Sequence, residues 1–140
     1  MNKLARHNFV IKGDAFEIFP DDDCYPESFR QIPDPPEKLY LIGNPNCLRE
    51  GLAIVGARKA TPYGVSCTRH FAEIAAKQNI AIISGGAYGC DGQAHKAAIA
   101  LKKKTVVFLG GGCNKIYPPR HYKMFQDVVD LGGALVSEKD

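Results

Sequence analysis

The chain has 140 residues, of which 45% are hydrophobic and 24% charged, and its formal net charge is +3. These values are ordinary for one globular domain. No apolar run approaches the roughly 18 residues that a membrane-spanning helix needs, and the N-terminus lacks the apolar core and cleavage site of a signal peptide. We therefore expect a cytoplasmic protein without a membrane segment.

The first 38 residues are predicted to form an irregular lead-in. Prolines recur through them, an acidic run spans residues 21–23, and the PDPP sequence at residues 33–36 is compatible with neither a helix nor a central strand. We therefore divide the chain into a Pro-rich, acidic linker over residues 1–38 and a core domain over residues 39–140.

Beyond residue 38, short apolar runs alternate with longer amphipathic segments. Strands alternating with helices build βαβ units. We therefore predict an α/β protein, with a three-layer Rossmann-like fold around a mostly parallel, doubly wound sheet. The runs LAIVGA and TVVFLG lack polar alternation, which is typical of strands buried on both faces. The predicted strands cover residues 39–43, 52–57, 81–84, 105–110 and 134–138, and the predicted helices cover 62–79, 91–102 and 119–132.

Local signals set the bounds of the three predicted helices. Thr61 stands before Pro62 and is a favoured N-cap, and Asp91 is the predicted N-cap of the second helix. Two glycines at 132 and 133 end the third helix. The predicted buried side of the first helix consists of Val65, Phe71, Ile74 and Ala75.

The segments that follow the predicted strands share one kind of chemistry. They read GARKATPYG, SGGAYGCD, GGGCNKIYPP and SE, in chain order, and in a parallel sheet they meet at one edge. Their glycines leave backbone N–H groups open at helix N-termini, Ser84 and Thr61 add hydroxyl donors, and Arg58 and Lys59 add positive charge. Phosphate groups bind to such donors, so the sequence predicts a phosphate-binding edge.

Basic residues are concentrated in the middle of the chain. Residues 58–123 contain eleven Lys and Arg against two acidic residues, whereas both flanking parts are net negative. We interpret the run at 102–104 as a solvated helix end, where lysine suits the helix dipole. The remaining basic residues form a candidate polyanion-binding face: Arg58, Lys59, Lys96, Lys115, Arg120 and Lys123.

Aromatic residues interleave with this basic face. Tyr88 and Tyr117 stand in the glycine-rich segments, and we predict that they stack on nucleic-acid bases. Phe71, Phe108 and Phe125 are predicted to be core residues instead.

The sequence does not support several catalytic and cofactor sites. A GxGxxG fingerprint after the first strand and a GxxxxGKS/T loop are both absent, so standard NAD and ATP sites are not expected. The five cysteines include no CxxC pair, which predicts free thiols and no metal site. Asp91, His95 and Glu138 could join Ser84 or Cys90 in a hydrolytic site, but we interpret Asp91 as a cap and His95 as a packing residue. We expect no catalytic residue and no cofactor.

Five motifs occur in a fixed order along the chain: LYLIGN, IVGARKATPYG, SGGAYGCDGQAH, TVVFLGGGCNKIYPP and ALVSE. Together they resemble the DNA-processing protein A family, also called DprA or Smf. The resemblance implies a Rossmann-like protein that is not an enzyme and binds single-stranded DNA in a basic pocket. It also implies a homodimer that loads the RecA recombinase during natural transformation and recombination.

By motif position, the resemblance implies that Arg58 is the principal phosphate contact. It further implies that Ser84, Gly85 and Gly86 line the pocket, and that residues 117–121 supply a second basic contact. The candidate nucleic-acid contacts are Arg58, Lys59, Ser84, Gly85, Gly86, Tyr88, Gly111, Gly112, Lys115, Tyr117 and Arg120.

The chain departs from the family pattern at a few positions. Tyr88 stands where the family has an Arg or another residue, Pro119 replaces a lysine of some members with Arg120 one position later, and His121 replaces the usual asparagine. The chain ends at Asp140, before the family's FPxRNR segment and any C-terminal winged-helix-like domain. We therefore expect a fragment or a shortened relative.

Two other functions of the same superfold stay open at this point. One is a nucleotide-hydrolysing enzyme of the phosphoribohydrolase kind, although its PGGxGTxxE motif is absent. The other is a module that binds a free mononucleotide without chemistry.

Overall fold

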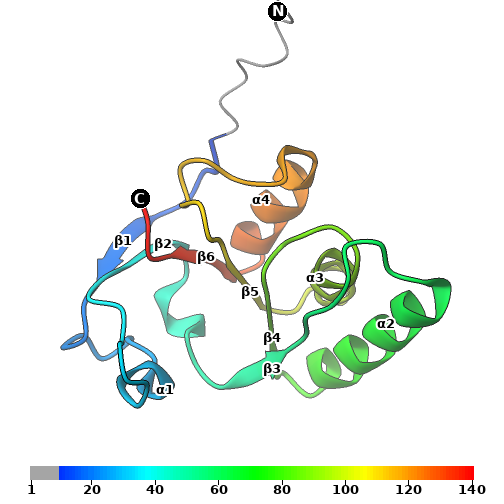
Figure 1. Cartoon of the computed structure of the whole chain (residues 1–140), viewed down its shortest axis with the longest axis horizontal. Coiled ribbons are helices and arrows are strands. Elements are labelled where there is room, and N and C mark those ends of the chain that lie inside the picture. Colours follow the sequence, from blue (N-terminus) through cyan, green and yellow to red (C-terminus); the bar gives the residue numbers. More distant parts are fainter. Residues whose placement is uncertain (1–9) are drawn as a thin grey trace, which may run out of the picture.

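The computed structural model describes residues 10–140, which form one sheet with helices around it (Figure 1). The strands are β1 (Ala15–Ile18), β2 (Leu39–Gly43), β3 (Gly51–Ala53), β4 (Ala81–Ser84), β5 (Thr105–Phe108) and β6 (Ala134–Ser137). The helices are α1 (Glu27–Arg30), α2 (Pro62–Lys77), α3 (Cys90–Ala100) and α4 (Tyr122–Asp130), with short 3₁₀ turns η2 (Pro45–Cys47) and η3 (Pro119–His121).

The six strands of the described residues lie in the order β1-β2-β6-β5-β4-β3. The pairs β3–β4, β4–β5 and β5–β6 are parallel, and β2 pairs antiparallel with both β1 and β6. The predicted α/β class and mostly parallel sheet are therefore confirmed.

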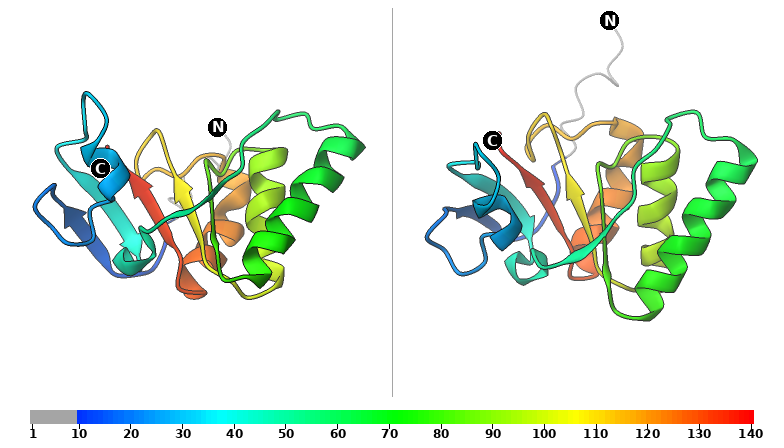
Figure 2. Two further views of the ribbon diagram at one scale, coloured as in Figure 1. Left: turned by 90° about the horizontal axis from the view of Figure 1, so that it is seen from below. Right: turned by 60° about the horizontal axis from the view of Figure 1, so that its bottom comes forward.

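The two faces of the sheet are covered by different parts of the chain. From β3 to β6 each crossover moves one strand in the same direction, so the right-handed rule places their helices on one face. Accordingly α2, α3 and α4 lie side by side there (Figure 2). The other face is covered by α1 and its flanking residues rather than by further crossover helices.

Neighbouring residues of the central strands alternate between two cores. Val107 of β5 packs in a core with Phe125 of α4. The adjacent Val106 packs in a second core with Tyr25 and against Phe29, both of which come from the N-terminal part of the chain. Both faces of β5 are thus buried, as the unbroken apolar run predicts.

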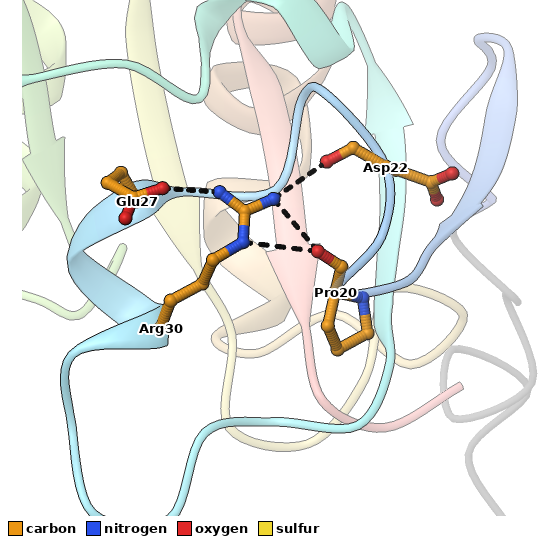
Figure 3. Close-up of polar contacts among 4 residues, drawn as sticks. All are labelled: Pro20, Asp22, Glu27 and Arg30. Carbon is orange, nitrogen blue, oxygen red and sulfur yellow. Dashed lines mark hydrogen bonds and ion pairs between the residues drawn. The ribbon is translucent and has the colours of Figure 1, made fainter.

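Residues 15–30, which the sequence presents as part of an irregular lead-in, form β1 and α1. Arg30 holds this segment in place (Figure 3): its guanidinium donates to the carbonyl oxygen of Pro20 from Nε at 3.1 Å and from Nη2 at 2.8 Å, and to that of Asp22 at 3.1 Å. It also pairs with Glu27 at 2.5 Å. The proposed domain boundary between residues 38 and 39 separates two paired strands, and it stays a prediction.

The buried side of α2 differs from the predicted one. Phe71 is 58% exposed and Ile74 43% exposed, whereas Ala72 and Ala76 are fully buried. The alanines of α2 face those of α3 in a separate small core. Short side chains bring the two helices close together, so the larger apolar residues of α2 lie outside the contact. The prediction for Phe71 and Ile74 is therefore wrong, and the one for Ala75 is confirmed.

The predicted buried strand at residues 52–57 is also wrong. β3 contains only residues 51–53, all three are exposed, and the strand pairs with β4 alone. An edge strand has a neighbour on one side only. The chain leaves the sheet after Ile54, whose N–H still bonds to the carbonyl oxygen of Ile83 at 2.9 Å.

One of the two predicted N-caps is confirmed. Thr61 Oγ1 accepts a hydrogen bond from the N–H of Gly64 at 3.1 Å, and Pro62 is the first residue of α2. Asp91 is not a cap, because α3 already begins at Cys90 with Gly89 in the cap position.

Candidate nucleic-acid interface

The four segments that follow the parallel strands lie at the carboxyl edge of the sheet. We call them the strand-end loops: residues 54–61 after β3, 85–89 after β4, 109–121 after β5 with the 3₁₀ turn η3 included, and 138–140 after β6. Hydrogen bonds or close packing join each loop to the next one.

The first and second strand-end loops touch through backbone groups. The N–H of Cys90 donates to the carbonyl oxygen of Ala57 at 3.2 Å. Gly89, with φ of +79°, lies so close to the carbonyl oxygens of Ala57 and Arg58 that a Cβ atom there would collide with both. The backbone that carries Arg58 is therefore seated on the start of α3.

The second and third strand-end loops are joined by His121. This side chain is buried, and its Nδ1–H donates to the carbonyl oxygen of Gly86 at 2.8 Å. Its ring also meets Tyr88 edge to face, with centroids 5.0 Å apart. Because His121 directly follows Arg120 and is the N-cap of α4, it fixes the position of Arg120 relative to the glycine turn after β4.

The third and fourth strand-end loops meet at the end of the chain. Gly112, with φ of +106°, lies against the backbone of Asp140, and Asn114 Nδ2 donates to Asp140 Oδ1 at 2.6 Å. Lys115 follows Asn114 and lies beside a hollow that Val10 and Ile42 also line. No described contact links Lys115 to the loop that carries Arg58.

The cationic side chains of the strand-end loops are free for a ligand. Arg58, Lys59, Lys115 and Arg120 are exposed, and the ion pairs within residues 10–140 include none of them. Unpaired guanidinium groups are strong donors to phosphate oxygens.

Two aromatic rings accompany these charges. Tyr117 is 65% exposed and Tyr88 is 38% exposed. Tyr117 stands between Lys115 and Arg120 in the chain, and Tyr88 precedes Gly89 in the loop that touches the Arg58 backbone. Rings in such places offer flat surfaces on which bases stack.

Not every predicted pocket residue presents a donor to a ligand. Ser84 is buried and its hydroxyl donates to the carbonyl oxygen of Ile54. The N–H of Gly85 donates to Asp91 Oδ2 at 3.2 Å. Gly86 has φ of +71° and packs against the ring of Phe125. These three residues shape the loops. Gly111 is exposed, and a Cβ atom there would meet nothing within 4 Å.

The residues considered for a hydrolytic site do not form one within the described chain. His95 is fully buried, its Nδ1 lies 2.7 Å from Thr105 Oγ1, and burial lowers its pKa to about 3. The packing role predicted for His95 is confirmed. Residues 10–140 contain no cluster of three or more His, Cys, Asp or Glu arranged to hold a metal ion. Over the same residues, no helix has the length and apolar character to span a membrane.

The sequence does not predict the structural roles of His121 and Gly89. Residues 117–121 are predicted to supply the second basic contact, but His121 among them is an internal bridge between two loops. Gly89 is the glycine that leaves room for the Arg58 backbone. Neither role has a local signal, because each depends on a segment about thirty residues away in the chain.

Comparison with known proteins matches this arrangement to one family. The family model for DNA recombination-mediator protein A matches residues 17–140. The chain is 39% identical over 119 residues to Protein Smf of Escherichia coli (strain K12), which covers 84% of this chain and 32% of Smf. It is 34% identical over 102 residues to DNA processing protein DprA of Bacillus subtilis (strain 168), which covers 71% of this chain and 34% of that protein. The chain therefore spans about a third of the length of these relatives.

Two solved structures share the fold. DNA processing protein A from Helicobacter pylori, described for its single-stranded DNA binding mode, has a TM-score of 0.80 and 31% identity and covers 94% of this chain and 58% of its own. DprA from Streptococcus pneumoniae has a TM-score of 0.76 and 28% identity and covers 99% of this chain and 48% of its own.

Proposed function

The chain belongs to the DNA recombination-mediator protein A family, and from this premise we propose that it binds single-stranded DNA along the strand-end loops. The observation that carries the proposal is the set of exposed, unpaired cations beside two accessible tyrosines at one edge of the sheet. The relative from Helicobacter pylori, described by its single-stranded DNA binding, supports the same ligand.

Arg58 makes the central phosphate contact in this proposal. Its loop is held by Gly89 and Cys90, so the guanidinium starts from a fixed backbone and loses less freedom on binding. Arg120 makes a second contact, and the His121 bridge to Gly86 keeps it near the same glycine turn. Tyr88 and Tyr117 stack on bases, which is sequence-tolerant because every base has an aromatic face.

Assembly and partners extend the proposal. We infer that the protein acts without catalysis in the cytoplasm, forms a homodimer, and delivers single strands to the RecA recombinase in natural transformation and recombination. Sedimentation of the purified chain tests the dimer. Assembly of RecA on a coated single strand, with and without the chain, tests delivery.

The primary test measures fluorescence anisotropy of a labelled oligo-dT strand and of a matched duplex at two salt concentrations. We expect preference for the single strand and weaker binding at the higher salt, because phosphate contacts release counterions. Equal affinity for strand and duplex, or no salt dependence, contradicts the proposed interface. Tighter binding of a free mononucleotide than of the oligonucleotide, or its hydrolysis, points to the nucleotide-based functions instead.

A further inference from the structure

A second basic site lies at the opposite edge of the sheet. Lys102, Lys103 and Lys104 precede β5, Asn79 precedes β4, and Arg49 precedes β3. Together with Asn46 these residues line a hollow of about 650 Å³, which we call the amino-edge hollow. It is built by segments before the parallel strands, whereas the strand-end loops follow those strands.

The positive charge of the amino-edge hollow is only partly offset by acidic side chains among residues 10–140. Its lining includes four cationic side chains and one acidic side chain, Glu50, and none of the four cations forms an ion pair within residues 10–140. Lys103 Nζ donates only to the neutral Asn79 Oδ1, at 2.7 Å. Adjacent like charges repel one another, and a bound anion relieves that repulsion.

The backbone at the hollow also favours a ligand role for the lysines. Lys102 has φ of +54°, a conformation that a lysine rarely adopts and that glycine adopts freely. Two other turns that follow helices use residues suited to such angles, Asn79 with φ of +61° and Gly132 with φ of +87°. Lys102 places a positive charge at the hollow, although a glycine at this position would give a less strained turn.

The helix dipole explains part of this arrangement but not all of it. Lysines near the C-termini of α2 and α3 interact favourably with the partial negative charge there. Arg49 belongs to no helix, however, and it lines the same hollow. Lys104 also interacts electrostatically with Cys47, whose thiol lines the same hollow. Burial raises the pKa of this thiol to about 11, and the positive charge of Lys104 lowers that pKa in part.

We propose that the amino-edge hollow binds a phosphate-bearing small anion, and specifically the polyphosphate of a free nucleoside triphosphate. The lining has an excess of three positive charges, which offsets most of the negative charge of a free triphosphate, and the volume lies within the range of small-molecule sites. Asn46 and Asn79 add amide groups of the kind that pair with ribose hydroxyls or base edges. A strand bound along the strand-end loops lies at the other edge, roughly 13 Å away along a four-residue strand.

The test is isothermal titration of the full chain with ATP, and separately with tripolyphosphate, in the absence of magnesium. The key variant is Lys102→Gly, because it removes one charge and also relaxes the turn, so it is expected to fold at least as well as the wild type. We expect Lys102→Gly and Lys104→Ala each to weaken ATP binding by about tenfold. Arg69→Ala, exposed on α2 and outside the lining, serves as the matched control and leaves affinity unchanged.

Two comparisons separate this site from the strand-end loops. Arg58→Ala is expected to leave ATP binding intact, and Lys102→Gly is expected to leave oligo-dT binding intact. Loss of ATP binding in Arg58→Ala alone overturns the proposal, because the nucleotide then binds at the strand-end loops. Absence of ATP binding in the wild type also overturns the proposal. Weaker oligo-dT binding in Lys102→Gly overturns it as well, because the hollow would then bind a DNA strand that continues around the sheet.

Discussion

Gly89 lies directly against the backbone of Arg58, with no room for a side chain between them. The contact ties the only arginine of the first strand-end loop to the cap of α3. A change at Gly89 therefore acts on a residue that it follows by about thirty positions in the chain.

Gly89→Ala is expected to lower both stability and DNA affinity. Its Cβ atom would collide with two carbonyl oxygens, and its φ of +79° is unfavourable for alanine, so we expect a loss of about 2 kcal/mol or more in the free energy of unfolding. Oligo-dT affinity should fall as well, because the Arg58 loop must move. Urea unfolding and anisotropy measure the two effects.

Gly111→Ala is the matched control, because a Cβ atom there meets nothing within 4 Å. It should change stability by less than about 0.5 kcal/mol. Equal losses of stability in Gly89→Ala and Gly111→Ala would show that the Gly89–Arg58 contact is not important for stability.

Arg58→Ala should weaken single-strand binding strongly without unfolding the protein. Arg58 is exposed and forms no ion pair in residues 10–140, so its loss removes a ligand contact and little else. We expect about a tenfold loss of affinity at low salt. The slope of log affinity against log salt should become shallower by about 0.7. Arg69→Ala, exposed on α2, is the control, and an equal loss there would mean that only net charge matters.

The site residues predicted from the sequence differ in how well their surroundings fit a ligand contact. Arg58 and Tyr117 are exposed, as a ligand contact requires. Ser84, by contrast, bonds to the backbone of Ile54, and this partner is visible only once β3 and β4 are paired. A glycine-rich segment predicts backbone N–H groups without side chains to shield them. It does not predict which of these N–H groups already donate hydrogen bonds within the protein.

The fold shows the same limit. Periodicity located β4, β5 and β6 within about two residues, because buried central strands must be apolar. It misjudged β3 and α2, because their environment depends on sheet order and on which helix faces which. Phe71 is apolar yet 58% exposed, since the alanines beside it make the contact with α3.

Tyr117 is expected to contribute base stacking. Tyr117→Ala should cost about 1–3 kcal/mol of oligo-dT binding free energy, with little effect on folding because the side chain is 65% exposed. Tyr117→Phe keeps the ring and should bind nearly as the wild type does. Equal losses in both variants would assign the effect to the hydroxyl group and not to stacking.

Arg30 is expected to stabilise the N-terminal layer of the protein. Its guanidinium donates to the backbone carbonyls of Pro20 and Asp22 and packs over the Tyr25 ring at 5.4 Å. Arg30→Ala should lower the free energy of unfolding by about 1–2 kcal/mol. Glu27→Ala removes only the exposed ion pair and should cost less than about 0.5 kcal/mol. A larger loss for Glu27→Ala would contradict the view that the carbonyl contacts dominate.

His95 should make the protein less stable as the pH falls below neutrality. Thr105 Oγ1 donates its own hydrogen to the carbonyl oxygen of Ile82 at 2.7 Å, so it must accept from His95 Nδ1–H. His95 Nε2 is buried and has no hydrogen-bond partner among the described residues. A proton on Nε2 would therefore be a buried, unpaired charge, and burial lowers the pKa of His95 to about 3.

The sign of the effect follows from where the proton binds. Above pH 6.5 the His95 ring is neutral in both states, so it gives no pH dependence. Below pH 6.5 the unfolded chain binds a proton on His95, whereas the native state does not bind it until about pH 3. The free energy of unfolding therefore falls by up to about 1.4 kcal/mol for each pH unit. His95→Asn keeps a donor to Thr105 but cannot titrate. The difference in unfolding free energy between wild type and variant should shrink by about 2 kcal/mol from pH 7 to pH 5, and a constant difference would falsify the assignment of a neutral, enclosed His95.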